Sequence, residues 1–207
     1  TDRSARIAPL RIRELAPLRP YVTEIEAVYI PRNVLTRANC APFAQALGNL
    51  ISVYEIEVAQ VPEGSGALLR RLPPNSPLVY VTLSGPGSTD ETLADLGRCT
   101  RLTSASLAGA KISNDGLRHL SGLGSLRTLV LRGTPISASG VQHLTSLSGL
   151  TSLDLVDTSV GDEDIGHLTK LSALVALDLR ATRVTVDAVQ RLQRALPRCQ
   201  IDWGPSK

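Results

Sequence analysis

Three histidines recur at a fixed spacing and are the first residues whose chemistry could be functional. His119, His143 and His167 stand 24 residues apart, and a column of imidazoles could bind a metal ion or respond to pH. Each histidine directly precedes a leucine of an apolar column, which places it at the flank of a buried helical stripe. Helix axes pack about 8–10 Å apart, whereas zinc needs its nitrogen ligands within about 2.1 Å of one centre. We therefore expect half-exposed members of a repeat and no metal site.

The three cysteines offer thiol chemistry, but their positions argue against it. Cys40, Cys99 and Cys199 are far apart in the sequence, and separate coils of a repeat cannot bring their Cα atoms within the ~7 Å that a disulfide needs. Cys99 shares its repeat position with Leu123 and Leu147, so we interpret it as a small buried residue. Unpaired thiols favour an intracellular location, while a removed targeting segment stays open.

Two aspartates form the one carboxylate pair of interest. Asp154 and Asp178 are also 24 residues apart, and on neighbouring strands they would lie about 5 Å from each other. Such a pair could hold a cation or raise the pKa of one carboxyl group. The neighbouring Arg132, Asp157 and Arg180 favour the other interpretation, a ladder of alternating charges on a solvated face.

A repeat of 24 residues positions all of these side chains. Lines that start at Leu78 carry apolar residues at the first position and then three, five, ten, fifteen and eighteen positions later, with Ser88 as the one exception. The first half of each line predicts a strand with one buried side, and the second half predicts an amphipathic helix. A single unit cannot bury its own apolar face, so stacked units predict a solenoid with one continuous core.

The composition fits such thin layers and removes several classes of protein. The 207 residues are 43% hydrophobic but only 3% aromatic, and methionine is absent. The sequence contains no run of 18 apolar residues, the length that a transmembrane helix needs. The net charge of +3 is too small for a nucleic-acid-binding surface. The segment from Ser84 to Ser88 lacks the glycine spacing of a nucleotide-binding loop. We expect no nucleic acid partner and no cofactor.

The strand halves of two lines resemble the leucine-rich repeat consensus. They read Leu-x-x-Leu-x-Leu-x-x-Thr-x-Ile from Leu126 and Leu-x-x-Leu-x-Leu-x-x-Thr-x-Val from Leu150. The helical halves are similar to those of ribonuclease-inhibitor-like, F-box-associated and bacterial leucine-rich repeat proteins. Most members of the family have asparagine or cysteine at the eighth position, where this chain has Thr134, Thr158 and Thr182. We expect these hydroxyl groups to bond a buried loop amide. Over residues 78–200, the resemblance implies an α/β fold, a curved right-handed solenoid with parallel strands on its concave face and helices on its convex face.

The chain is expected to form one continuous domain. Residues 1–24 would be a basic N-terminal cap or the end of a preceding repeat, and residues 25–77 two degenerate repeats. Residues 78–197 form the five regular repeats, and residues 198–207 a C-terminal cap in which Ile201 and Trp203 cover the last leucines. In the second degenerate repeat, Ile51, Tyr54 and Ile56 fit the apolar strand positions.

The outward strand residues define the predicted binding surface, because the resemblance places the strands on the concave face. Small neutral residues occupy its middle, and charged residues its ends. We predict a non-enzymatic protein–protein interaction module; the alternative is a scaffold or assembly subunit that contacts a larger complex through residues 1–77. The predicted partner-binding residues are Tyr29, Glu55, Tyr80, Thr82, Ser106, Val130, Arg132, Asp154, Asp157, Asp178 and Arg180.

Overall fold

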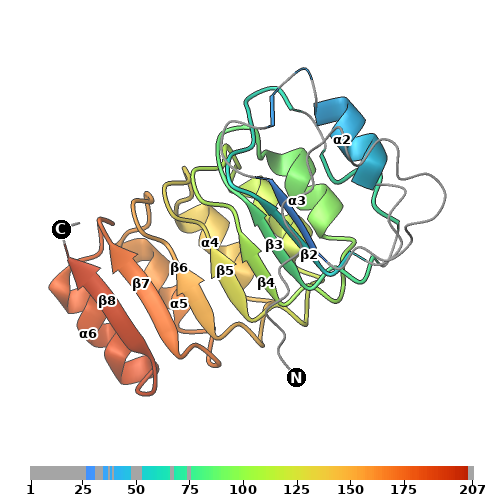
Figure 1. Ribbon diagram of the computed structural model, residues 1–207. Helices are drawn as coiled ribbons and strands as arrows, with labels where there is room; N and C mark the ends of the chain where they lie inside the picture. The colour runs from blue at the N-terminus through green and yellow to red at the C-terminus, as the bar shows by residue number, and fades with distance from the viewer. Residues whose placement is uncertain are drawn as a thin grey trace, which may run out of the picture.

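The structure is a computed structural model that describes residues 27–30, 35–36, 38, 40–47, 53–65, 68–73 and 76–204. Within these residues, eight parallel strands form one sheet in which each strand pairs with the next along the chain (Figure 1). The strands are β1 (Ala27–Ile30), β2 (Glu55–Val58), β3 (Tyr80–Leu83), β4 (Ser104–Ser106), β5 (Thr128–Val130), β6 (Ser152–Asp154), β7 (Ala176–Arg180) and β8 (Gln200–Gly204).

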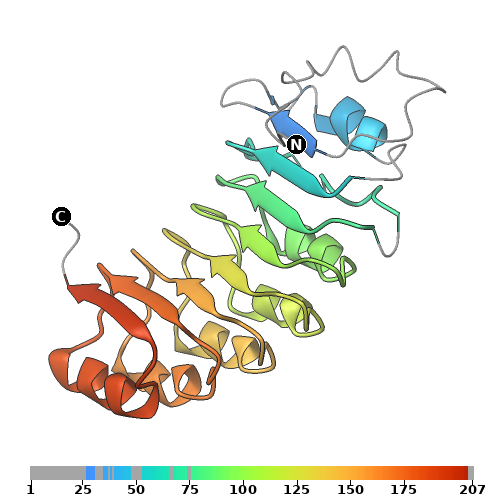
Figure 2. The same ribbon diagram turned by 60° about the horizontal axis from the view of Figure 1, so that its bottom comes forward.

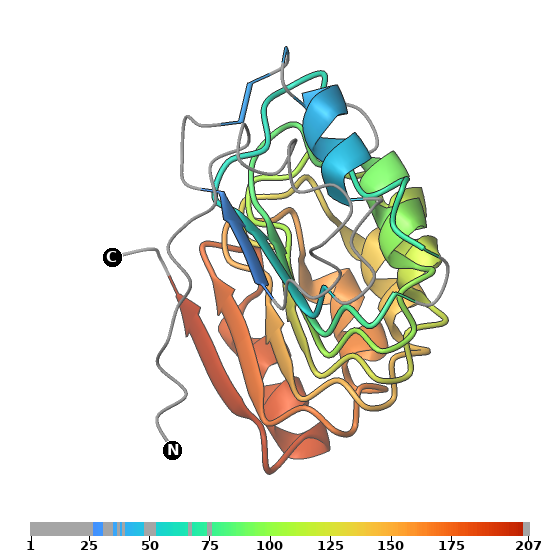
Figure 3. The same ribbon diagram turned by 45° about the vertical axis from the view of Figure 1, so that its right-hand side comes forward.

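The helices lie together on one side of this sheet (Figures 2 and 3). This arrangement of parallel strands and one-sided helices confirms the predicted α/β solenoid. Between β2 and β3, the described residues contain no helix. The predicted segment 1–24 lies outside the described residues. The helices are α2 (Cys40–Leu47), α3 (Asp90–Leu96), the 3-10 helix η1 (Asp115–Leu120), α4 (Ala138–Leu144), the 3-10 helix η2 (Asp162–Asp164), α5 (Ile165–Leu168) and α6 (Val186–Ala195).

The core lies between the sheet and the helices and continues from coil to coil, from Val28 to Cys199. Strand alternation creates it: in β3, Val81 and Leu83 are buried, while Tyr80 and Thr82 point to the opposite face. The same alternation in each described strand from β1 to β7 separates a buried apolar layer from an outward row of side chains. The sheet therefore presents one face that the core does not use.

A left-handed residue ends the strand segment of each coil from β3 to β7. Its amide donates a hydrogen bond to a carbonyl one coil further along, as Gly133 does to Val156 at 2.8 Å. Asp157 and Ala181 adopt this conformation with a φ of 56° each, although side chains disfavour it. The full column, all at positive φ, is Gly85, Gly109, Gly133, Asp157 and Ala181.

The threonines that replace the usual asparagine or cysteine stabilise the same turn, but not through the expected bond. Their hydroxyl groups donate to the carbonyl oxygen of the last strand leucine in their own coil, rather than accepting from a loop amide. That carbonyl has two lone pairs, so in two of these turns it also accepts the backbone amide of the threonine. The pairs are Thr134 with Leu131, Thr158 with Leu155, and Thr182 with Leu179.

On the convex side, polar side chains link the start of one helix to the start of the next. The carboxylate of Asp90 accepts the amide and the hydroxyl of Ser113, at 2.7 and 2.6 Å. Asp162 accepts the same two groups of Thr185 in the last coil. At the equivalent position, Ala138 has no side-chain oxygen, and the amide of Gly161 is instead accepted by the buried Asp164 of its own coil. At these three helix starts, a side chain of the preceding coil or of the same coil thus satisfies a backbone amide.

The strand register of the second coil differs from the prediction by two residues. Val53, Ile56 and Val58 occupy the buried positions, and Tyr54, which was expected in the core, is 40% exposed. The spacing Val-x-x-Ile-x-Val satisfies the template with three apolar residues, whereas a start at Ile51 would bury a tyrosine hydroxyl. The paired residues Val28, Ile56 and Val81 give the two degenerate repeats lengths of 28 and 25 residues.

The C-terminal residues add β8 as an eighth strand to the sheet. Ile201 pairs in register with Leu177 and packs against the core. Trp203 pairs with Leu179 but leaves 42% of its surface exposed. Ile201 thus covers part of the core at this end, whereas Trp203 lies largely on the surface.

Candidate functional site on the concave face

The strand residues that alternate with the core form two outward rows across the sheet, which we call the concave face. In each row, residues from neighbouring strands are direct register partners, about 4.8 Å apart. None of these side chains belongs to the buried core. The first row reads Ala27, Glu55, Tyr80, Ser104, Thr128, Ser152, Ala176 and Gln200, and the second reads Tyr29, Glu57, Thr82, Ser106, Val130, Asp154, Asp178 and Asp202.

At the β6–β7 end, arginines neutralise the predicted carboxylate pair. Arg132 donates from Nε and Nη2 to Oδ2 of Asp154, at 3.2 and 3.1 Å, and its Nη2 lies 3.8 Å from Asp178. Arg180 binds both carboxylate oxygens of Asp178, with Nε 2.9 Å from Oδ1. The side chains therefore form the alternating charge ladder that the sequence favoured over a cation site.

The backbone and the burial of Asp178 add to this arrangement. Partial burial alone would raise the pKa of the Asp178 carboxyl group. Hydrogen bonds from the side chain and the backbone amide of Arg180, with the charges of Arg180 and Arg132, outweigh burial and hold that pKa below its ordinary value. Asp154 similarly accepts the backbone amide of Val156 at 2.9 Å. Both carboxylates are thus already satisfied within the chain.

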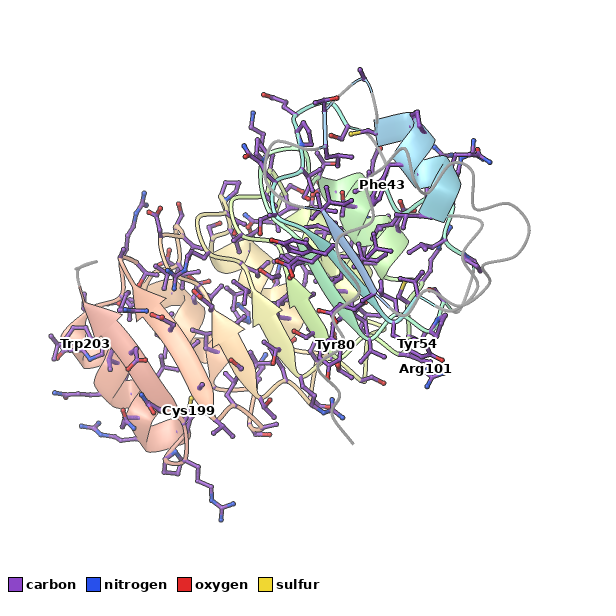
Figure 4. The ribbon with its side chains drawn as sticks, in the orientation of Figure 1. Phe43, Tyr54, Tyr80, Arg101, Cys199 and Trp203 are labelled. Carbon is purple, nitrogen blue, oxygen red and sulfur yellow. The ribbon has the colours of Figure 1, made fainter. Side chains whose placement is uncertain are left out.

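At the β1–β3 end, two tyrosines and two glutamates gather without such pairing. Glu55 lies beside Tyr80, and Glu57 lies beside Tyr29. The tyrosines are 44% and 53% exposed, at Tyr29 and Tyr80 respectively. Within the described part of the chain, no basic side chain forms an ion pair with either glutamate. Figure 4 shows Tyr80 in this part of the sheet, far from Trp203 at the other end.

Glu57, which was not among the predicted binding residues, lies on the concave face between Tyr29 and Thr82. Glu55, which was predicted, lies in the other row, between Ala27 and Tyr80. The buried spacing of Val53, Ile56 and Val58 is the signal that could have identified the correct row.

Small side chains fill the middle of the concave face, as predicted. Thr82, Ser106 and Val130 are half-buried neighbours along one row. The serines and threonines of the other row are equally short. This middle region is a shallow surface with few groups that would obstruct an approaching main chain.

Asp157 does not lie on the strands. It occupies the left-handed turn after β6, with its side chain exposed. No ion pair joins it to a described arginine. The prediction that Asp157 belongs to the charge ladder is therefore wrong, because the turn places this residue beyond the end of β6.

The remaining candidate groups are spread over the convex side. His119, His143 and His167 belong to η1, α4 and α5 and are half-buried, as expected. Among the described residues, no three histidine, cysteine or acidic side chains gather closely enough to hold a metal ion.

All three cysteines are buried free thiols. Burial raises the pKa of the Cys99 thiol to about 11, with Asp95 adding to the shift and Arg98 opposing it. A thiol with a raised pKa is the opposite of an activated nucleophile. Cys99 behaves as the small core residue that its repeat position predicted.

Comparisons with known proteins bear on the fold. No family model and no curated protein matches the chain. Among solved structures, an internalin (InlF) from Listeria monocytogenes is 18% identical and superposes with a TM-score of 0.57. The superposition covers 91% of this chain and 62% of the internalin chain. Internalin C2 from the same bacterium is 17% identical with a TM-score of 0.51, covering 82% and 84%. At these identities the likeness concerns the fold alone. In the described part of the chain, every helix is too short or too polar to span a membrane.

Proposed function

The chain is a leucine-rich repeat solenoid, and from that premise we propose that it is a non-enzymatic protein-binding module that holds a protein partner on its concave face. The observation that supports this most is the continuity of that face. Eight strands in register give it a length of about 34 Å, which matches about six turns of a helix.

The chemistry of the concave face supports a binding role over a catalytic one. Asp154 and Asp178 are held by arginines, and the Cys99 thiol is buried. The short side chains between the two ends leave room for a helix or loop of the partner, and the charged ends can fix its direction.

A test is to obstruct the middle of the face with long side chains. Ser106→Arg and Val130→Arg would each place a guanidinium group among short neighbours, while Gln142→Arg adds the same group on the exposed side of α4. Partner proteins captured from extracts of the source cells should be lost with the first two variants and kept with the third, as measured by quantitative mass spectrometry. Equal capture by all three correctly folded variants would overturn the proposal.

A second candidate function is that of a scaffold or assembly subunit that contacts a larger complex through residues 1–77. Exposed Tyr29 and Tyr54 in this range favour it, because aromatic side chains are enriched at interfaces. Deleting residues 1–24, or replacing Tyr54 with serine, should then reduce entry into the complex without unfolding the coils. A chain that still enters the complex after both changes would exclude this function.

A further inference from the structure

The four side chains Tyr29, Glu55, Glu57 and Tyr80, which we call the Tyr–Glu patch, form a distinct group at the β1–β3 end of the concave face. The two glutamates are two residues apart on the same face of β2, which places them about 6.6 Å apart along the strand. One tyrosine flanks them from β1 and the other from β3. Each glutamate therefore has a tyrosine as its register partner on the neighbouring strand.

The core does not need these rings. Val28, Ile56 and Val81 fill the buried side of the same three strands and are at most 4% exposed. Tyr29 and Tyr80 extend from the opposite side, where about half of each residue is exposed. An aromatic ring that adds nothing to the core and faces outward is available to a partner.

The charges of the patch also differ from those at the other end of the face. Arg132 and Arg180 neutralise Asp154 and Asp178, but Glu55 and Glu57 have no such partner among the described side chains. Two carboxylates without a described ion-pair partner repel an acidic or phosphate-bearing ligand and attract a cationic one.

We propose that the Tyr–Glu patch binds two arginines, spaced Arg-x-Arg, on an extended segment of the protein partner. Side chains two residues apart on an extended chain lie on one side with the same spacing of about 6.6 Å as the two glutamates. A guanidinium group can stack on a tyrosine ring while it donates to a carboxylate, which suits arginine better than lysine. This inference rests on the proposed binding function and names the chemistry of the partner at one end of the face.

The probe for the test is a fluorescein-labelled peptide, Gly-Ser-Arg-Gly-Arg-Ser-Gly, with a second peptide in which neutral citrulline replaces both arginines. Fluorescence anisotropy with the full chain at low salt should show binding of the arginine peptide and little binding of the citrulline peptide. Low salt matters because exposed charge pairs are screened at high ionic strength.

Charge-matched variants locate the site. Glu55→Gln with Glu57→Gln should weaken binding about ten-fold, whereas Asp115→Asn with Asp187→Asn, which removes two exposed convex carboxylates, should change it less than about two-fold. Tyr80→Ser should weaken binding about three-fold, and Tyr80→Phe should not, because the ring face is kept. Equal binding by both double variants, or no preference for arginine over citrulline, would overturn the inference.

The chain's own residues 1–24 contain the same spacing at Arg11 and Arg13, so they supply a competing occupant. If the peptide binds only after Arg11→Ser and Arg13→Ser are introduced, the patch belongs to this segment and the proposed partner contact is wrong. Failure of the broader function has a different signature. In that case, the amount of captured partner would be the same with Ser106→Arg and Val130→Arg as with the wild type, whether or not the arginine peptide binds.

Discussion

The two ends of the concave face differ in whether their acidic side chains form described ion pairs. At the β6–β7 end, two aspartates and two arginines satisfy one another across neighbouring coils. At the β1–β3 end, two glutamates stand between exposed tyrosines with no described ion-pair partner. The two ends also differ in the regularity of their repeats. The charge ladder lies in regular 24-residue coils, and the Tyr–Glu patch begins in the degenerate ones. Strands at both ends are in register, but only in the regular coils do the acidic side chains of the concave face have described arginine partners.

The first prediction asks whether this contrast is confined to the surface. Ile56→Ala in β2 and Leu153→Ala in β6 each remove a side chain that is at most 1% exposed. Both should lower the free energy of unfolding by about 3 kcal/mol, measured by chemical denaturation followed by circular dichroism. Val130→Ala, on the concave face, should cost less than about 1 kcal/mol. A small effect for Ile56→Ala alone would mean that the degenerate coils are not part of the same cooperative core.

The turns allow a second comparison, between a coil that borders the degenerate repeats and one inside the regular array. Gly133→Ala should cost about 1–2 kcal/mol, because φ is 64° there and no atom lies within 3.4 Å of the new Cβ. Gly85→Ala should cost more, because its Cβ would also lie 3.1 Å from the backbone oxygen of Val61. Ala181→Gly is the matched reversal and should stabilise the chain by a few tenths of a kcal/mol or more. Thermal denaturation of the three variants checks this order, and equal costs at both glycines would contradict it.

The charge ladder should contribute to stability, and the Tyr–Glu patch should not. Asp178→Asn should cost about 1 kcal/mol at neutral pH, while Glu55→Gln with Glu57→Gln should stay within about 0.5 kcal/mol. The pKa of Asp178 is lowered in the folded chain, so its stabilising effect is present above the ordinary carboxyl pKa and is lost as the pH falls through the folded value. The difference between wild type and Asp178→Asn should therefore shrink in acid. A larger cost for the glutamate pair would reverse the comparison.

The smallest expected effect concerns Asp164, the buried acid that accepts the Gly161 amide of its own coil. The preceding coil has Ala138 at the position of Asp90 and Asp162 and so offers no side-chain oxygen for this bond. Burial raises the pKa of Asp164, with Glu163 adding to the shift, while the Gly161 amide and His167 oppose it. The protonated form is thus favoured in the folded chain, and stability is lost as the pH rises through the raised pKa. Asp164→Asn keeps an oxygen for Gly161 and removes the charge. Relative to this variant, wild type should lose less than about 1 kcal/mol between pH 3.5 and 7, measured by denaturation across that range. A wild type that instead gains stability relative to Asp164→Asn as the pH rises from 3.5 to 7 would contradict this sign.

The sequence predicted the regular coils well because each buried position recurs at the same spacing. Leu129, Leu153 and Leu177 were assigned from that column, and the adjacency of Asp154 and Asp178 followed from it. The second coil could not be aligned in this way, because changes in repeat length move the strand relative to the template. Tyr54 also fits an apolar position of that template, although it is exposed in the structure. Backbone conformation was equally hidden: nothing in the sequence places Asp157 in a left-handed turn, and so its separation from the ladder was missed.

Hydroxyl-radical footprinting of the chain alone and with its co-purified partner tests the central claim most directly. The exposed aromatic residues Tyr29, Tyr80 and Trp203 report on the two ends of the sheet. Binding at the β1–β3 end should protect Tyr29 and Tyr80 from oxidation and leave Trp203 unchanged. Protection of Trp203 with the two tyrosines unaffected would contradict the account and place the partner at the opposite end.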